Sequence, residues 1–194
     1  MNKVWVAIVL AIILVPTGVL LRGYFIHPAY GDDFVRVGKI NIHFGSQISD
    51  CMAVQIDPLS AQDLVDSKAF TALFDPDGVK TTGPGGEEVI DDAASRKYAI
   101  ATYELGRILV PLGHTQYTAY THPYNNETES VRSLSDGNSA LPIVLFEIGD
   151  ETLIRRVAPG QIIVRGADAD EINHAACRLD LEILRIVYGI RLPE

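Results

Sequence analysis

The pattern that decides the fold lies in residues 142–190, PIVLFEIGDETLIRRVAPGQIIVRGADADEINHAACRLDLEILRIVYGI. Three apolar runs, at 142–148, 152–157 and 161–165, are separated by the turn sequences GDE and APG. Strands joined by turns this short usually pair as antiparallel neighbours. We therefore expect a C-terminal three-stranded antiparallel meander.

The residues after Gly166 predict one long helix. Asp168, with Glu171 three residues later, is typical of a helix start, and Gly189 of a helix end. On a helical wheel the charged side chains form one narrow stripe and the apolar side chains cover a wide arc. The stripe consists of Glu171, His174, Arg178, Glu182 and Arg185. An arc this wide needs cover from more than one side, so we expect the helix to lie between the meander and the N-terminal elements.

Two polar residues, Asn173 and Asp180, fall within the apolar arc. An unpaired buried carboxylate is costly, so Asp180 must meet a partner, take up a proton or reach solvent. Arg107 and Arg165 are the candidate partners. Three interpretations stay open: a satisfied pair that holds the helix against the sheet, a ligand-binding or catalytic pocket, and an error in the phase of the wheel.

Upstream of the C-terminal third the elements are shorter and less regular. We expect a strand with a bulge at 34–44, a strand at 51–56, a helix from Ser60 to Phe74, a helix at 87–105 and a strand at 107–112. Residues 113–140 are too polar and turn-rich for a core element. Together these elements predict an α+β domain over residues 34–194, preceded by a connector at 23–33.

An apolar segment of 18 residues, 4–21, follows Lys3. As a helix it would be about 27 Å long, close to the thickness of a bilayer core. It fits an uncleaved signal anchor, a cleaved signal peptide or a buried core helix. Residues 16–18 make a poor cleavage site, which favours a transmembrane signal anchor over residues 1–22.

Charge indicates the orientation of that anchor. All 25 acidic residues follow Arg22, whereas Lys3 has no acid near it. A basic N-terminal side favours a cytoplasmic N-terminus. We therefore expect a single-pass protein of the cell membrane whose main domain is extracytoplasmic. The net charge of −9 also argues against a nucleic-acid partner.

Two features fit an extracytoplasmic domain. The chain has two cysteines, Cys51 and Cys177, which allow one disulfide or two separate buried thiols. Asn126 begins an Asn-Glu-Thr sequon and is a possible glycosylation site.

Motifs of common enzyme classes are missing from the sequence. The histidines lack zinc-type spacing, and no CxxC, HExxH, GxSxG, P-loop or dinucleotide motif occurs. The sequence therefore predicts no metal and no cofactor, and argues against an enzyme. Acidic residues around a glycine-rich link could bind calcium or form a solvated turn: Asp75, Asp77, Glu87, Glu88, Asp91 and Asp92.

A polar segment at 113–130 concentrates aromatic and imidazole rings: His114, Tyr117, Tyr120, His122 and Tyr124. Rings with polar tips are common at protein and glycan contact surfaces. Three alternatives stay open: tyrosines folded back onto the sheet, a binding surface, and a metal held by His114 and His122.

The C-terminal run also resembles known sequences. It has a strand ending IIV-x-G at Ile162, Ile163, Val164 and Gly166, then Ala175, Ala176, Arg178 and Leu179 in a helix that closes with Gly189 and Ile190. This run is similar to the ends of some uncharacterised archaeal exported and surface-layer-associated proteins. The resemblance implies a cell-envelope setting and carries over no activity or functional residue.

These observations lead to one expected function and one alternative. We expect a membrane-anchored extracytoplasmic protein that acts by protein–protein contact or self-assembly, as a cell-envelope, surface-filament or assembly component. An unpaired edge of the meander could mediate self-assembly by strand addition. The alternative is an extracytoplasmic enzyme or ligand-binding protein that uses Asp180 or the His114–Tyr124 loop.

Overall fold

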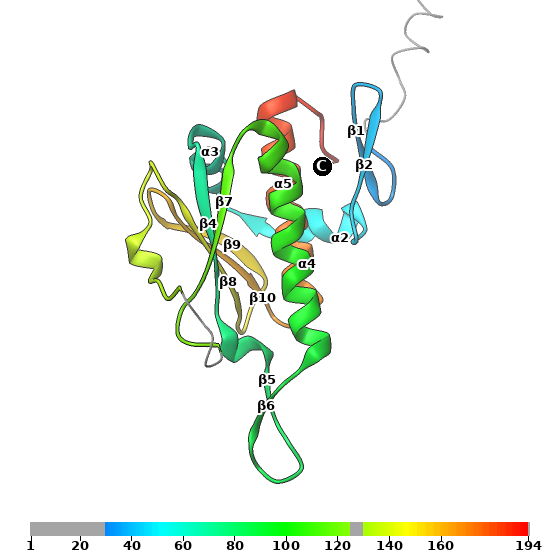
Figure 1. The fold of residues 1–194 in the computed structure, drawn as a ribbon. Helices are drawn as coiled ribbons and strands as arrows, with labels where there is room; N and C mark the ends of the chain where they lie inside the picture. The colour runs from blue at the N-terminus through cyan, green and yellow to red at the C-terminus, as the bar shows by residue number, and fades with distance from the viewer. Residues whose placement is uncertain (1–29, 125–129, 194) are drawn as a thin grey trace, which may run out of the picture.

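The computed structural model describes residues 30–124 and 130–193. A six-stranded sheet carries helices on one face, so the expected α+β class is confirmed (Figure 1). The strand order is β3-β9-β10-β8-β4-β7. The strands are β3 (Gln55–Ile56), β4 (Ala69–Phe74), β7 (Thr115–Tyr120), β8 (Ile143–Ile148), β9 (Leu153–Ala158) and β10 (Gln161–Gly166).

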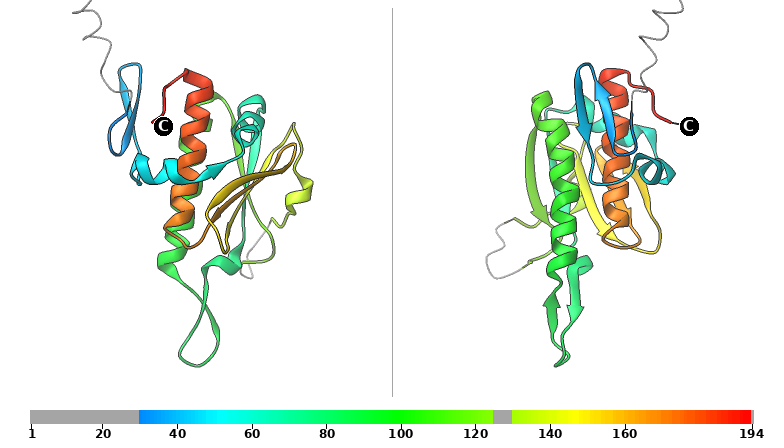
Figure 2. Two further views of the ribbon diagram at one scale, coloured as in Figure 1. Left: turned by 180° about the vertical axis from the view of Figure 1, so that it is seen from behind. Right: turned by 90° about the vertical axis from the view of Figure 1, so that its right-hand side faces the viewer.

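Four helices pack on one face of this sheet and share a buried cluster with it. They are α2 (Ile48–Ala53), α3 (Pro58–Asp66), α4 (Asp92–Leu109) and α5 (Glu171–Tyr188). Figures 1 and 2 show α4 and α5 between the sheet and a hairpin formed by β1 (Phe34–Val37) and β2 (Ile40–His43). The wide apolar arc of α5 is thus covered from several sides, as its wheel predicts.

The predicted C-terminal meander is wrong, although its three strands are present. β8 pairs with β10 in parallel, and β10 lies between β8 and its antiparallel hairpin partner β9. Ile143 to Phe146 of β8 are buried on both faces of the sheet, so β8 takes a central position between β10 and β4. In β9, Arg155 and Val157 are exposed, which suits a position nearer the edge.

Three upstream elements also differ from expectation. The predicted bulged strand at 34–44 is the hairpin β1–β2, because Gly38 has a φ of 61° and turns the chain. Cys51 lies in α2, not in a strand. The predicted helix from Ser60 to Phe74 ends at Asp66, and the next apolar run is the central strand β4.

The middle of the chain differs in a similar way. A hairpin of β5 (Lys80–Thr82) and β6 (Glu88–Ile90) precedes α4, which begins at Asp92 and continues through Gly106. The predicted strand at 107–112 is therefore the last turn of α4 followed by the 3-10 helix η2 (Val110–Leu112). Residues 115–120, expected outside the core, form β7, which pairs in parallel with β4.

The second face of the sheet has a smaller cover. Leu73, Ala119, Ile143, Leu145 and Ile163 form a separate buried cluster there. Leu134, from the 3-10 helix η3 (Leu134–Asp136), packs against this cluster. The domain is therefore a two-layer structure in which the helices bury one sheet face and a short segment covers part of the other.

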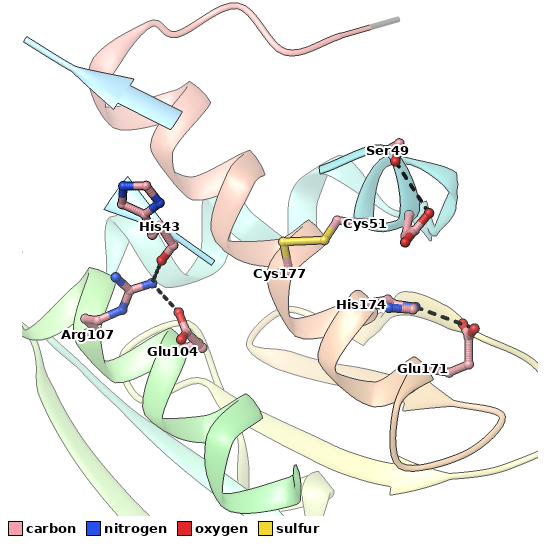
Figure 3. The surroundings of a disulfide bond; sticks show 9 residues. His43, Ser49, Cys51, Glu104, Arg107, Glu171, His174 and Cys177 are labelled. Atoms are coloured by element: carbon pink, nitrogen blue, oxygen red, sulfur yellow. Dashed lines mark hydrogen bonds and ion pairs between the residues drawn. A yellow bond between two sulfur atoms is a disulfide. The ribbon is translucent and has the colours of Figure 1, made fainter. Parts of the chain in front are cut away.

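A disulfide between Cys51 and Cys177 joins α2 to the middle of α5 (Figure 3). The two Cα atoms are 5.7 Å apart, and the residues are separated by 126 positions in the sequence. Both side chains are buried. The crosslink therefore fixes the N-terminal part of the domain to its C-terminal helix.

In the part of the chain that the structure describes, no helix combines the length and apolar character needed to span a bilayer. The predicted signal anchor at 1–22 and most of the connector at 23–33 lie outside the described residues.

Loss of the disulfide should destabilise the domain strongly. Closing a loop of this length stabilises a fold by about 4–5 kcal/mol, chiefly by restricting the unfolded chain. We expect the double variant Cys51→Ser/Cys177→Ser to lose about that much unfolding free energy in urea denaturation. Reduced and oxidised wild-type protein provide the matched comparison. Equal urea midpoints for the oxidised and reduced proteins would contradict the prediction.

Candidate functional site

The carboxyl ends of β4 and β7 place several polar side chains together. These strands are parallel neighbours, so the residues after Phe74 and after Tyr120 emerge at the same edge of the sheet. Asp75 and Asp77 follow β4, and Thr121 and His122 follow β7. In open sheets with parallel strands, ligands commonly bind outside this edge.

The side chains at this edge contact one another directly. His122 Nε2 lies 3.1 Å from Asp77 Oδ1, and His122 Nδ1 lies 3.0 Å from Thr121 Oγ1. The Thr121 hydroxyl donates to Asp75 Oδ1 over 3.4 Å. Asp75, Asp77 and His122 each offer one atom that could bind a metal ion, and these three atoms lie within 4.8 Å of one another. We call these three residues the carboxyl-edge cluster.

Lys80 adds a positive charge beside this cluster. Its Nζ lies 2.9 Å from Asp77 Oδ1 and 3.3 Å from Glu88 Oε2. The hydrogen bond from Lys80 is the main cause that lowers the pKa of Asp77, with a further contribution from His122. Asp77 is therefore a carboxylate that attracts cations at neutral pH.

A cavity of about 160 Å³ adjoins the cluster and shares Asp75 with it. Its wall includes Ser95 and Tyr98 of α4, together with Tyr120 and Tyr124. Tyr98 is only 3% exposed, and its hydroxyl makes no well-formed hydrogen bond within residues 30–124 and 130–193. Burial, followed by the charges of Asp75 and Glu147, raises the pKa of this hydroxyl, so it stays protonated.

A second, larger hollow of about 610 Å³ runs between α4 and β7. It is lined by Phe74, Ala99, Thr102, Tyr103, Gly106, Arg107, Val110, Pro111, Gln116, Thr118 and Tyr120. Tyr103 and Val110 are 66% and 49% exposed at its rim. We call this hollow the edge groove, because β7 is the last strand of the sheet.

The structure divides the aromatic and histidine candidates of residues 113–130 between separate places. Tyr120, His122 and Tyr124 gather at the carboxyl edge, where the rings of Tyr120 and Tyr124 stack 5.3 Å apart. Tyr117 is exposed on the face of β7 opposite to the one that carries Tyr120. His114 precedes β7, where burial and then the charge of Lys68 lower its pKa. The length of β7 separates His114 from His122, so the two do not form a common metal site.

Asp180 is fully buried, and neither of its oxygens has a hydrogen-bond partner in the described part of the chain. Burial and then the nearby Glu104 raise its pKa well above the usual range, while Arg107 opposes this shift. Asp180 therefore keeps its proton at pH values where an exposed aspartate has already lost it. The interpretation as a hydrogen-bonded Asp180–arginine pair is wrong: Arg107 binds elsewhere, and Arg165 pairs with Glu147.

Arg107 instead joins α4 to the N-terminal hairpin. Its Nη2 donates to the backbone carbonyl of His43 over 2.7 Å and pairs with Glu104, as Figure 3 shows.

Asn173 donates to the carbonyl of Ala169, and its Oδ1 is buried with no partner among the described atoms. Asn173 and Cys177 line a further cavity of about 450 Å³ between α4 and α5. Asn173 thus reaches a hollow, whereas Asp180 is sealed in the core.

Sequence reasoning missed the carboxyl-edge cluster and the edge groove. Asp75 and Asp77 stood out only as part of a longer acidic run, and His122 is 45 residues from Asp77. A central strand at 69–74 would have been the necessary signal, because it places the Asp-Pro-Asp-Gly turn at a sheet edge. Asn126, the possible glycosylation site, lies outside the described residues.

Comparisons of the chain with known protein families, with curated proteins and with solved structures found no match.

Replacing Asp180 by asparagine should change how stability depends on pH. Because the pKa of Asp180 is raised in the folded state, only the unfolded chain releases this proton as pH rises above about 4. Wild-type stability then falls by up to about 1.4 kcal/mol per pH unit until the folded pKa is reached. The Asp180→Asn variant lacks this loss.

We therefore expect the melting temperature of Asp180→Asn, relative to wild type, to increase as the pH rises above about 4, the ordinary aspartate value. The exposed Asp50 provides a matched control, Asp50→Asn, whose difference from wild type should stay nearly constant. A constant difference for Asp180→Asn would show that this carboxyl is ionised in the folded protein.

Proposed function

We propose that this protein is a single-pass, membrane-anchored extracytoplasmic component of the cell envelope that acts by protein–protein contact. The observation that carries the contact role is the exposed edge of β7 beside the apolar edge groove. The apolar leader at residues 4–21 and the acidic body support the location.

The backbone of β7 is available on its outer side. Thr115 and Thr121 donate their amides towards the β4 side, to Lys68 and Phe74. Peptide groups alternate along a strand, so those of Gln116 and Thr118 point away from β4. Within 30–124 and 130–193, no segment pairs with β7 at these two positions. An added strand would therefore find free donors and acceptors there.

The chain itself uses this mode of contact at the end of β7. Val131 forms a parallel bridge with Tyr120, in which the Tyr120 amide donates to Ser130 and the Arg132 amide donates to Tyr120. The outer side of β7 therefore accepts an extended segment without rearrangement. A partner strand would continue the same line over Thr118 and Gln116.

The edge groove supplies the side-chain contacts. Its wall is mainly apolar and aromatic, and its charged member, Arg107, is already paired with Glu104. An extended segment on β7 would direct every second side chain into this groove. The partner we infer is a protein with an extended segment that carries apolar residues at alternate positions.

The proposed location predicts the behaviour of the full chain in cell fractionation. We expect it in the membrane fraction after alkaline washing, and released only by detergent. Protease added outside the cytoplasmic membrane should digest the main domain. Recovery of the untruncated chain from the soluble cytosolic fraction would contradict the anchor.

The proposed contact predicts a position-specific crosslink on intact cells. A photo-crosslinking residue at the exposed rim position Tyr103 should give one discrete adduct. Val110→Glu places a charge at the groove rim, and Thr118→Pro removes an outward amide. We expect each change to reduce the adduct at least tenfold.

Ile100 provides the matched control, because it lies on α4 with 48% exposure, similar to the 49% of Val110, and does not line the edge groove. Ile100→Glu should keep the adduct. An adduct that survives both Val110→Glu and Thr118→Pro, in variants that melt like wild type, would rule out this contact site.

A further inference from the structure

We propose that the carboxyl-edge cluster, Asp75, Asp77 and His122, binds one divalent transition-metal ion of the Zn²⁺ class. The inference does not depend on the protein-contact role, because the cluster lies at the end of β4 and β7 and the contact uses the outer side of β7. It assigns a second kind of site to the domain.

The three side chains already converge. His122 Nε2 and Asp77 Oδ1 are 3.1 Å apart, and all three ligand atoms lie within 4.8 Å of one another. Ligand atoms at about 2.0–2.2 Å around a tetrahedral zinc ion are about 3.4 Å apart. His122 and Asp77 are thus close to that spacing, and an Asp75 oxygen lies within 4.8 Å of both ligand atoms.

Thr121 connects two members of the cluster and orients the His122 ring. The Thr121 hydroxyl has one proton, which it donates to Asp75 Oδ1. The contact between Thr121 Oγ1 and His122 Nδ1 then requires His122 to donate from Nδ1. A histidine that donates from Nδ1 can bind a metal ion through Nε2, the atom that faces Asp77.

His122 Nε2 and Asp77 Oδ1 already contact each other at 3.1 Å, so an ion bound by both atoms would replace this direct hydrogen bond. Thr121 meanwhile holds the imidazole in the orientation that binding requires. Metal-ligating histidines typically make such a hydrogen bond through their other ring nitrogen.

The ligand types select the class of ion. One imidazole and two carboxylates suit a borderline ion such as Zn²⁺ better than Ca²⁺ or Mg²⁺, which prefer oxygen ligands. Three protein ligands leave at least one coordination position for water or another oxygen ligand.

The adjoining cavity provides an independent indication of a ligand. The Tyr98 hydroxyl is protonated and 97% buried, lines this cavity and lacks a well-formed hydrogen bond within the described chain. Asp75 belongs both to the cavity wall and to the cluster. A water molecule or ligand oxygen on the ion would give the Tyr98 hydroxyl a hydrogen-bond acceptor.

Lys80 competes with the ion but does not block it. Lys80 contacts Asp77 Oδ1 and also Glu88 Oε2, so it keeps an acceptor when the ion takes Asp77. The ion must displace Lys80 from Asp77, and the cost of breaking this ion pair weakens ion binding in the wild type. A variant without the lysine charge should therefore bind the ion more strongly. A gain in affinity on removing the Lys80 charge would be specific to this site, whereas a variant that lacks a ligand residue can lose binding for other reasons.

The test is a calorimetric titration of the untagged, oxidised full chain with ZnCl₂. We expect one equivalent of Zn²⁺ to bind, His122→Ala and Asp77→Asn each to weaken binding at least tenfold, and Lys80→Met to strengthen it several-fold. Titration with Co²⁺ should give visible absorption bands, which His122→Ala removes.

Another exposed histidine–aspartate pair provides the matched control. His43 Nδ1 lies 3.2 Å from Asp33 Oδ2 outside the cluster, so His43→Ala should leave Zn²⁺ binding unchanged. The proposal is wrong if the wild type binds no Zn²⁺, or if His43→Ala weakens binding as much as His122→Ala does. Circular dichroism of each variant verifies that it is folded.

Discussion

The burial of α5 is the constraint on which the rest of the domain depends. Ile172, Leu179, Leu181 and Ile183 of this helix are fully buried. The helix packs on β10 and contacts α2, α3 and α4, so each of these elements covers part of its apolar arc. The charges on its polar stripe are paired within the helix, because Arg178 and Arg185 both form ion pairs with Glu182. A helix buried on so many sides requires a sheet beneath it and helices beside it.

The sequence predicts this C-terminal part well and the remainder poorly, for physical reasons. The boundaries of α5 and of its three preceding strands follow from long, regular apolar patterns. The pairing of the three strands does not follow from these patterns. The short connection between β8 and β9 can join direct neighbours, and it can also join two strands that leave a place for β10 between them. Nothing local distinguishes that arrangement from a meander.

The other errors arise where local pattern and tertiary position disagree. The run Ala69–Phe74 follows a real helix, and its apolar residues fit a helical continuation as well as a central strand. β7 is polar because it is an edge strand with an exposed face, so its sequence resembles a loop. These two strands position the carboxyl-edge cluster, so without them the sequence could not predict that its residues lie together. The burial of Asp180 could be predicted from its wheel position, but its lack of an arginine partner could not.

The position of the disulfide also has a mechanical consequence. A pull between the two ends of the chain runs from residue 50 through Cys51 directly to Cys177, and does not load residues 52–176. That shielded loop contains all six strands of the main sheet, the edge groove and the carboxyl-edge cluster. The segment at 34–50 could extend by at most about 60 Å before the crosslink takes the load. Tension on the termini would therefore load the hairpin β1–β2 on one side of the crosslink and residues 178–188 of α5 on the other, and would not pull directly on the chain that forms the sheet.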